Sequence, residues 1–216
     1  MKTNLLQAFE KIPYFTIEGF KQFSSIESPH TVRTLLHRWS QAKHLITLKK
    51  GVYMTRRFYE AHRQDRDFSA AVSTILQPQS YLSLEFILQE HNLLTEITYP
   101  ITCITIRNAR TITNPIGTFW YRHIRPELYQ GFTIKEYLGI RYGRASLAKA
   151  LFDFLYLRPI PTKYRAKKFN LAEELRLNLD ELDQTMQAEF SALVESSNSE
   201  KMRAILDNFR SNLWQP

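Results

Sequence analysis

The chain has 216 residues, 44% of them hydrophobic, and a net charge of +8. This length suits one large domain or two small ones, and the apolar content is ample for packed cores. No run approaches the ~20 apolar residues of a membrane span and no apolar signal region opens the chain, so we expect a cytoplasmic protein that contacts no membrane. A single cysteine, Cys103, excludes an intrachain disulfide, and its apolar run ITCITIR indicates a buried strand residue rather than a nucleophile.

Positive charge is concentrated near the N-terminus. Residues 1–67 hold 12 lysines and arginines against 6 acidic residues, a net charge of +6, whereas the remainder holds 17 basic and 15 acidic residues. A local excess of this kind is typical of a module that displaces counterions from a phosphate backbone. The charged stretch EAHRQDRDFS follows, and we place a domain boundary at Asp67, with residues 1–67 in one domain and 68–216 in the other.

Two short helices are predicted first. Residues 5–12 carry a helical apolar pattern that Pro13 stops. Thr16 can cap a second helix, IEGFKQFSS, with Phe15 and Phe20 placed as a hydrophobic staple across its first turn.

A third helix is predicted from Ser28, which can act as its cap, with Pro29 at the first helical position. Its apolar residues recur at helical spacing and form one buried stripe: Val32, Leu35, Leu36 and Trp39. The opposite face has no acidic side chain and carries His30, Arg33, Thr34, His37 and Gln41, with Arg38 and Lys43 on its flank. Such a helix can lie against phosphates and base edges, although a solvated surface helix that happens to lack acids has the same pattern.

A two-stranded hairpin is predicted after this helix. Ile46 and Leu48 alternate with polar neighbours, the sequence Lys49-Lys50-Gly51 supplies a turn, and alternation resumes at Val52 and Met54. Three short helices followed by a hairpin indicate an N-terminal winged helix-turn-helix. The candidate DNA-binding residues are Ser28, His30, Thr31, Arg33, Thr34, His37, Arg38, Lys49 and Lys50.

We expect Arg33, Thr34, His37 and Arg38 near base edges or phosphates in the major groove, and Lys49 and Lys50 on the adjacent backbone. Ser28, His30 and Thr31 can add phosphate contacts at the helix N-terminus.

The sequence offers little sign of a metal site or of catalytic residues. His30, His37 and His44 repeat every seven residues, but two helical turns separate neighbours by ~10.5 Å, too far to share one zinc ion, so we expect no metal. No phosphate-binding loop, dinucleotide fingerprint, HExxH or GxSxG motif occurs. We therefore expect no cofactor, no catalytic residues and no enzymatic activity.

An acidic group, Asp180, Glu181 and Asp183, is the strongest remaining catalytic candidate and would make the protein a metal-dependent nuclease or nucleotidyltransferase. At the start of a predicted helix, acidic side chains more simply complement the helix dipole.

The second part of the chain mixes both periodicities, which predicts an α+β fold. FSAAVSTILQ and YLSLEFILQEHNLL have helical patterns, whereas ITCITIR, RTIT and GTFWYRHI favour an antiparallel meander, to which FTIKEYLGIRYG can add one or two strands. In TFWYRHIRPELY, aromatic rings lie beside cationic side chains, a combination that can bind nucleic acid or a protein. The simpler interpretation is a strand that alternates buried Phe119, Tyr121 and His123 with exposed Trp120, Arg122 and Ile124, or the reverse.

Helices return at ASLAKALFDFLYL, which Pro159 and Pro161 end. A basic segment follows that is either a second nucleic-acid patch or a solvated linker, with Lys163, Arg165, Lys167 and Lys168 as its cations. Capping-box spacing occurs at Asn170 and at Asn178, and a last helix is predicted over Ser199 to Leu213. The apolar stripe of that helix favours core packing, with a partner or a second copy as the alternative.

The order of these motifs resembles that of the AbiEi antitoxins of bacterial type IV toxin–antitoxin systems. The similar segments are LKKGVYMT, YLSLEFILQEHNLLTE, the strand region from Ile101 to Phe132 and ASLAKALFDFLYL, and together they cover most of the chain. The last resembles the family motif A-x-x-E-K-A-L-x-D in Ala145, Lys149, Ala150, Leu151 and Asp153, with Ala148 where the family has an acidic residue.

The resemblance implies a non-enzymatic transcriptional repressor that binds inverted repeats in double-stranded DNA upstream of its own operon, where copies can self-associate. It also implies an antitoxin whose C-terminal domain counters a nucleotidyltransferase-class toxin, without implying direct contact. The alternatives are a protein-interaction module, with the aromatic strand or last helix as interface, and a stand-alone winged-helix regulator without antitoxin activity.

Overall fold

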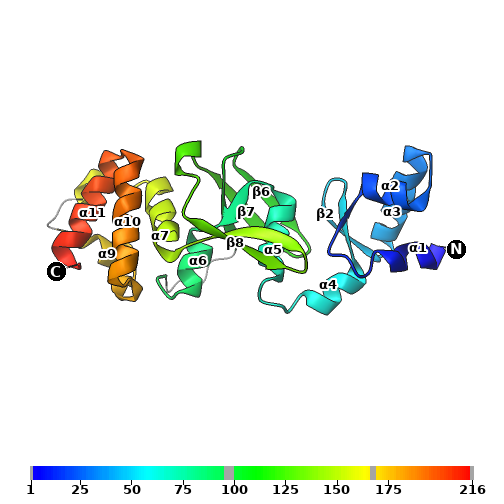
Figure 1. Ribbon diagram of the computed structural model, residues 1–216, viewed down its shortest axis with the longest axis horizontal. Coiled ribbons are helices and arrows are strands. Elements are labelled where there is room, and N and C mark those ends of the chain that lie inside the picture. Colours follow the sequence, from blue (N-terminus) through cyan, green and yellow to red (C-terminus); the bar gives the residue numbers. More distant parts are fainter. Residues whose placement is uncertain (1, 95–99, 166–168, 215–216) are drawn as a thin grey trace.

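The computed structural model describes residues 2–94, 100–165 and 169–214. These form an elongated α+β molecule with the N-terminal helices and a small sheet at one end, a larger sheet in the middle and the C-terminal helices at the other end (Figure 1). No helix in the described ranges combines the length and apolarity needed to cross a bilayer.

The N-terminal part contains α1 (Lys2–Ala8), β1 (Phe15–Thr16), α2 (Ile17–Ser24), α3 (Pro29–Gln41), β2 (Leu45–Lys49) and β3 (Val52–Thr55). Its three strands form an antiparallel sheet in the order β1-β3-β2. The predicted caps are confirmed: Thr16 Oγ1 accepts from the Gly19 amide at 3.0 Å and Ser28 Oγ from the Thr31 amide at 3.3 Å. The predicted staple is confirmed as well, because the rings of Phe15 and Phe20 lie 5.9 Å apart.

Two hydrophobic clusters meet at the β2–β3 hairpin. The smaller one lies between the helices and one face of the hairpin and contains Phe9, Phe15, Phe20, Val32, Leu36, Trp39 and Leu45. Ile46, Leu48 and Met54, on the hairpin, belong instead to the larger cluster, which continues into the six-stranded sheet. Because alternate strand residues point to opposite sides, the hairpin packs against both parts of the molecule.

The middle layer begins with α4 (Arg56–His62), α5 (Phe68–Leu76), β4 (Ser80–Leu82) and α6 (Glu85–Glu90). It continues with β5 (Ile101–Thr105), β6 (Arg110–Asn114), β7 (Gly117–His123), the 3₁₀ turn η1 (Pro126–Leu128), β8 (Phe132–Tyr137) and β9 (Ile140–Ala145). The strand order is β6-β7-β5-β4-β9-β8. Helix α5 covers one face, where the Tyr121 hydroxyl donates to the Ser73 carbonyl at 2.7 Å, and α7 (Leu147–Leu157) covers part of the other.

The predicted antiparallel meander is wrong in one respect. Strands β5 and β7 are parallel neighbours, β4 and β9 are also parallel, and β6 lies outside β7 at the sheet edge. The burial patterns explain this order: β5 is buried along most of its length and occupies the interior, whereas β6, with Ile112 as its one large apolar side chain, suits an edge. The two strands expected in FTIKEYLGIRYG are present as the β8–β9 hairpin.

A second correction concerns YLSLEFILQEHNLL, which was predicted to be wholly helical. Tyr81 and Leu82 lie in β4, and the helix begins only at Glu85. Between them Leu84 has φ 60° and ψ −142°, a backbone conformation that side chains rarely adopt and that turns the chain sharply from strand to helix. A short apolar run does not distinguish a buried strand from a buried helix.

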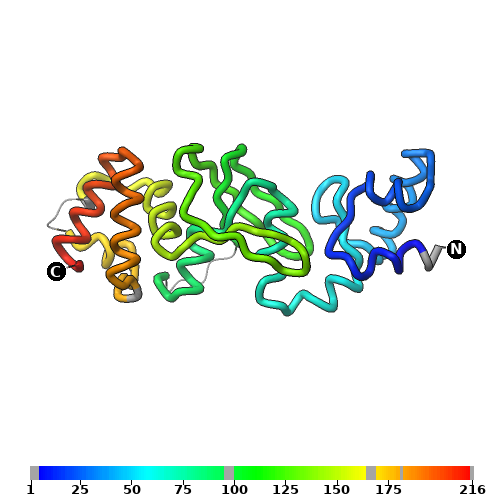
Figure 2. The backbone as a smooth tube through the Cα atoms, in the orientation of Figure 1, coloured from blue at the N-terminus to red at the C-terminus, as the bar shows by residue number. Residues whose placement is uncertain are grey.

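The C-terminal end contains α7, α8 (Thr162–Arg165), α9 (Leu171–Glu174), the 3₁₀ turn η2 (Leu179–Glu181), α10 (Gln184–Ser197) and α11 (Glu200–Asn212). The chain path places α10 and α11 side by side beyond α7 (Figure 2). Asn170 caps α9 as predicted, but Asn178 precedes only η2 and makes no side-chain cap, and Asp183 caps α10 instead. The stripe of α11 is buried against the rest of the molecule at Met202, Ile205, Leu206 and Phe209.

Candidate nucleic-acid interface

Helix α3 presents an exposed basic face. Val32 and Leu36 are fully buried and Trp39 is 8% exposed, which fixes the helix on the smaller cluster. The predicted contact residues on its other side are all exposed: His30, Thr31, Arg33, Thr34, His37 and Arg38. The helix has no acidic residue, and among the described side chains no carboxylate forms an ion pair with Arg33 or Arg38. The basic side chains of this face are therefore available to an anionic partner.

The start of α3 is fixed by its cap. Ser28 is exposed, and its hydroxyl oxygen accepts from the Thr31 amide. The Ser28 hydroxyl oxygen therefore caps the helix as an acceptor, and a phosphate contact would use the O–H of the same hydroxyl as donor.

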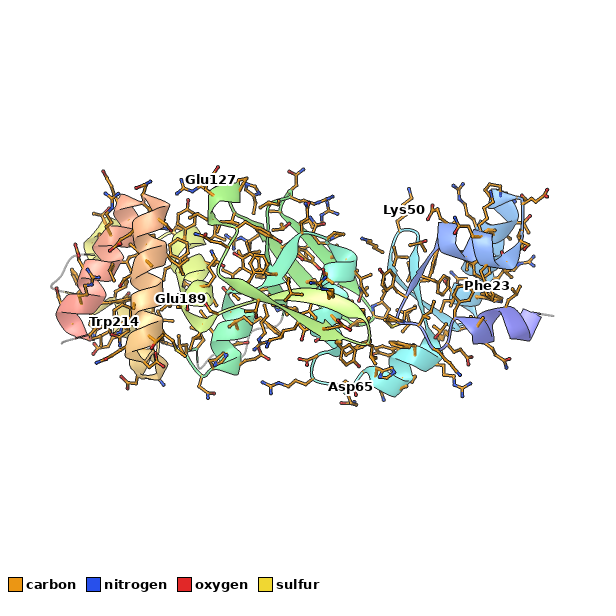
Figure 3. All side chains as sticks on the ribbon, in the orientation of Figure 1. Phe23, Lys50, Asp65, Glu127, Glu189 and Trp214 are labelled. Carbon is orange, nitrogen blue, oxygen red and sulfur yellow. The ribbon has the colours of Figure 1, made fainter. Side chains whose placement is uncertain are left out.

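The hairpin tip carries one exposed lysine. Gly51, with φ +79°, forms the turn with Lys50, and Figure 3 shows the Lys50 side chain projecting away from the hairpin. This ammonium can follow a phosphate backbone beside α3.

Lys49 has a different role from the one predicted for it. Its Nζ donates to the Ile75 carbonyl at 2.7 Å and to the Leu76 carbonyl at 2.9 Å, where α5 ends. Burial, followed by the charges of Arg110 and Arg107, lowers the pKa of Lys49. An ammonium held by helix-terminal carbonyls is not free to bind phosphate, so Lys49 is not part of the candidate surface.

Arg107 and Arg110 were not identified from the sequence. Both are exposed, and the hairpin lies beside their sheet edge, where Asn114 Nδ2 of β6 donates to the Leu48 carbonyl of β2 at 3.1 Å. Some 60 residues separate these arginines from the hairpin, and no local pattern signals that they share its charge. They continue the positive potential from the hairpin onto the larger sheet.

Of the second predicted basic patch, only the Lys163 side chain is among the described residues, and it lies away from this surface. Lys163 is exposed on α8, which packs on α9 and α11 at the opposite end of the molecule from α3 (Figure 1). The Arg165 side chain and all of Lys167 and Lys168 lie outside the described residues.

No metal site emerges from the side chains that the structure describes, where no group of three or more His, Cys, Asp or Glu residues is placed to hold an ion. In the acidic group near α10, Asp183 caps the helix by accepting from the Met186 amide at 2.8 Å, and Asp180 is exposed. The Glu181 side chain lies outside the described set.

A fully buried polar network lies under α7. Lys149 and Asp153 are both fully buried, with Nζ and Oδ1 2.6 Å apart. The Tyr81 and Ser83 hydroxyls donate to Asp153 Oδ2 at 2.9 and 2.8 Å, and Lys149 also donates to the Leu128 carbonyl at 2.9 Å. Burial raises the pKa of Asp153 and lowers that of Lys149, and the contact between the two groups opposes both shifts.

This network joins α7, β4 and η1, and all its charged atoms are shielded from solvent. Lys149 and Asp153 belong to the segment ASLAKALFDFLYL, and Tyr81 and Ser83 belong to YLSLEFILQEHNLLTE. All four side chains are buried and contribute to the packing of the C-terminal part. Neither a protein-family model nor a curated protein matches this chain.

Proposed function

We propose that this protein is a DNA-binding transcriptional repressor whose N-terminal part is a winged helix-turn-helix. Four residues separate α2 from α3, and a hairpin follows α3, an arrangement typical of that module. The observation that carries the proposal is the acid-free, exposed face of α3, with Arg33 and His37 at its centre and Lys50 on the adjacent hairpin tip.

In the proposed complex α3 enters the major groove. Arg33, Thr34, His37 and Arg38 face base edges or phosphates, and Lys50, supported by Arg107 and Arg110, follows the backbone. A bound repressor then blocks access to the promoter of its own operon. Two copies on an inverted repeat would each present one α3 to successive half-sites.

We further propose that the protein acts as an antitoxin in the cytoplasm, countering a nucleotidyltransferase-class toxin from the neighbouring gene. The support for this role is the resemblance of the motif order to the AbiEi family. Co-expression of that toxin with the wild-type chain and with the Arg33→Ala variant tests it. Growth restored by both proteins is the expected result, because countering the toxin does not require α3, whereas failure of the wild type to restore growth would contradict the role.

Replacement of Arg33 tests the repressor. If Arg33 reads guanine, Arg33→Ala lowers discrimination between the upstream DNA and a scrambled duplex by about 1–3 kcal/mol. Arg141→Ala, which removes an exposed arginine from β9, is the matched control and leaves that ratio unchanged. An unchanged ratio in Arg33→Ala would reject the reading role. Absence of salt-sensitive DNA binding by the wild-type chain would favour a protein-interaction module.

A further inference from the structure

Trp120 lies on β7 near the β6 edge of the six-stranded sheet, beside the start of α6, where the Phe86 amide donates to Thr102 Oγ1 at 3.0 Å. It is 45% exposed, and it is directly opposite Thr111 on β6 and beside Thr102 on β5. On β6 and β7 the same face carries further threonine hydroxyls, and those of Thr113 and Thr118 form a 3.1 Å hydrogen bond. The indole therefore forms a flat stacking surface within a polar surround.

A small hollow adjoins this surface. Arg122, two residues along β7 and about 7 Å from Trp120 on the same face, lines a cavity of about 130 Å³ together with Glu85 and Arg158. The Arg158 guanidinium lies 5.2 Å from the centre of the Phe154 ring, which orients it. In the described part of the chain, neither Arg122 nor Arg158 forms an ion pair with a carboxylate.

The wall of the hollow includes Leu84, the residue whose backbone is held at φ 60° and ψ −142°. The charged side chains that line the hollow are two arginines, Arg122 and Arg158, and one carboxylate, Glu85. Their net charge is positive, beside an exposed aromatic ring.

We propose that Trp120 and this hollow bind single-stranded nucleic acid, with a base stacked on the indole and a phosphate held between Arg122 and Arg158. Stacking on a protein ring needs an unpaired base face, which a duplex does not offer. The threonine hydroxyls beside the ring can bond to sugar or phosphate oxygens. Glu85 can accept from a base amino group or a ribose hydroxyl. The site is separate from α3 and does not depend on the proposed repressor function.

Fluorescence anisotropy of the full chain with fluorescein-labelled oligo(U) and oligo(dT) 12-mers tests this proposal, and the two probes distinguish ribose from deoxyribose. Trp120→Ala is expected to weaken binding of the preferred oligomer roughly 5- to 150-fold. Phe23→Ala, which removes a 56% exposed ring from α2, is the matched control and leaves affinity unchanged. Arg122→Gln combined with Arg158→Gln weakens binding and lowers the salt slope by about 0.7 for the phosphate released.

Indole emission gives a second readout. The other tryptophans are more enclosed, Trp39 at 8% exposure and Trp214 partly buried, so an oligomer stacked at the site quenches mainly Trp120. Quenching by oligo(U) in the wild type, lost in Trp120→Phe, supports the proposal. Equal affinity of the wild type and Trp120→Ala, quenching that persists in Trp120→Phe, or no binding of either oligomer by the wild type would each overturn it, the last favouring a protein contact.

Discussion

Lys149 and Asp153 form a fully buried ion pair one helical turn apart on α7, with 2.6 Å between Nζ and Oδ1. The Tyr81 hydroxyl from β4 and the Ser83 hydroxyl, which directly follows that strand, donate to the carboxylate, and the Leu128 carbonyl of η1 accepts from the ammonium. The pair therefore holds α7 to the sheet at the centre of the C-terminal part. Its contribution to the free energy of unfolding can be measured.

Removal of one partner leaves the other charge buried and unpaired. We expect Asp153→Asn or Lys149→Met to lower the free energy of unfolding by about 3–5 kcal/mol in urea denaturation. The double variant Lys149→Met/Asp153→Asn should lose less than the sum of the two single losses, because no isolated charge remains. Strict additivity would mean that the two groups do not interact.

Lys49 and Lys50 are neighbours with different predicted effects. Lys50→Ala should weaken binding to every duplex similarly and flatten the dependence of log K on log salt by about one unit. Lys49→Met should leave that slope unchanged and lower the free energy of unfolding by about 1.5–3 kcal/mol, because two carbonyls at the end of α5 lose a charged donor. If Lys49→Met changed the salt slope as Lys50→Ala does, Lys49 would contact DNA after all.

Ser28 is predicted to act first as a helix cap. Ser28→Ala should destabilise the protein by about 1 kcal/mol, as measured by chemical denaturation. Ser28→Asp keeps the cap and serves as the comparison: stability should be retained while DNA binding weakens, because the added carboxylate repels phosphate. Equal DNA affinity of the Ser28→Asp variant and the wild type would place the nucleic acid away from the start of α3.

Cys103 should be inert in the folded protein. It is fully buried, and burial raises the pKa of its thiol to about 12. Because the thiolate is the reactive form, iodoacetamide at pH 8 should label Cys103 only in denaturant, and labelling of the folded protein should rise only as pH approaches the raised pKa. Rapid native labelling at pH 8 would show that the thiol is accessible.

The N-terminal elements could be predicted from the sequence because their signals are local. The caps at Thr16 and Ser28 and the apolar stripe of α3 each lie within one helix, and all are confirmed. The role of Lys49 could not be predicted, because it depends on where α5 ends, 26 residues later in the chain.

The larger sheet could also be predicted only in part from the sequence. Alternating side chains predicted the strands, and Trp120 is exposed between buried Phe119 and Tyr121, but beyond Arg122 the alternation shifts, with His123 exposed and Ile124 buried as the strand ends. The parallel pairing of β5 with β7 and the sharp turn at Leu84 depend on tertiary packing, which places the most buried strands inside the sheet. For the same reason the hollow beside Trp120 brings together residues from β7, α6 and the end of α7.

The most direct test of the central proposal is fluorescence-anisotropy binding of the wild-type chain to the DNA upstream of its gene and to a scrambled duplex, each across a salt series. Tight binding that prefers the upstream DNA and weakens steeply as salt rises is the expected result. Weak binding of equal strength on both duplexes would contradict sequence-specific repression and leave α3 as a basic surface without a reading role.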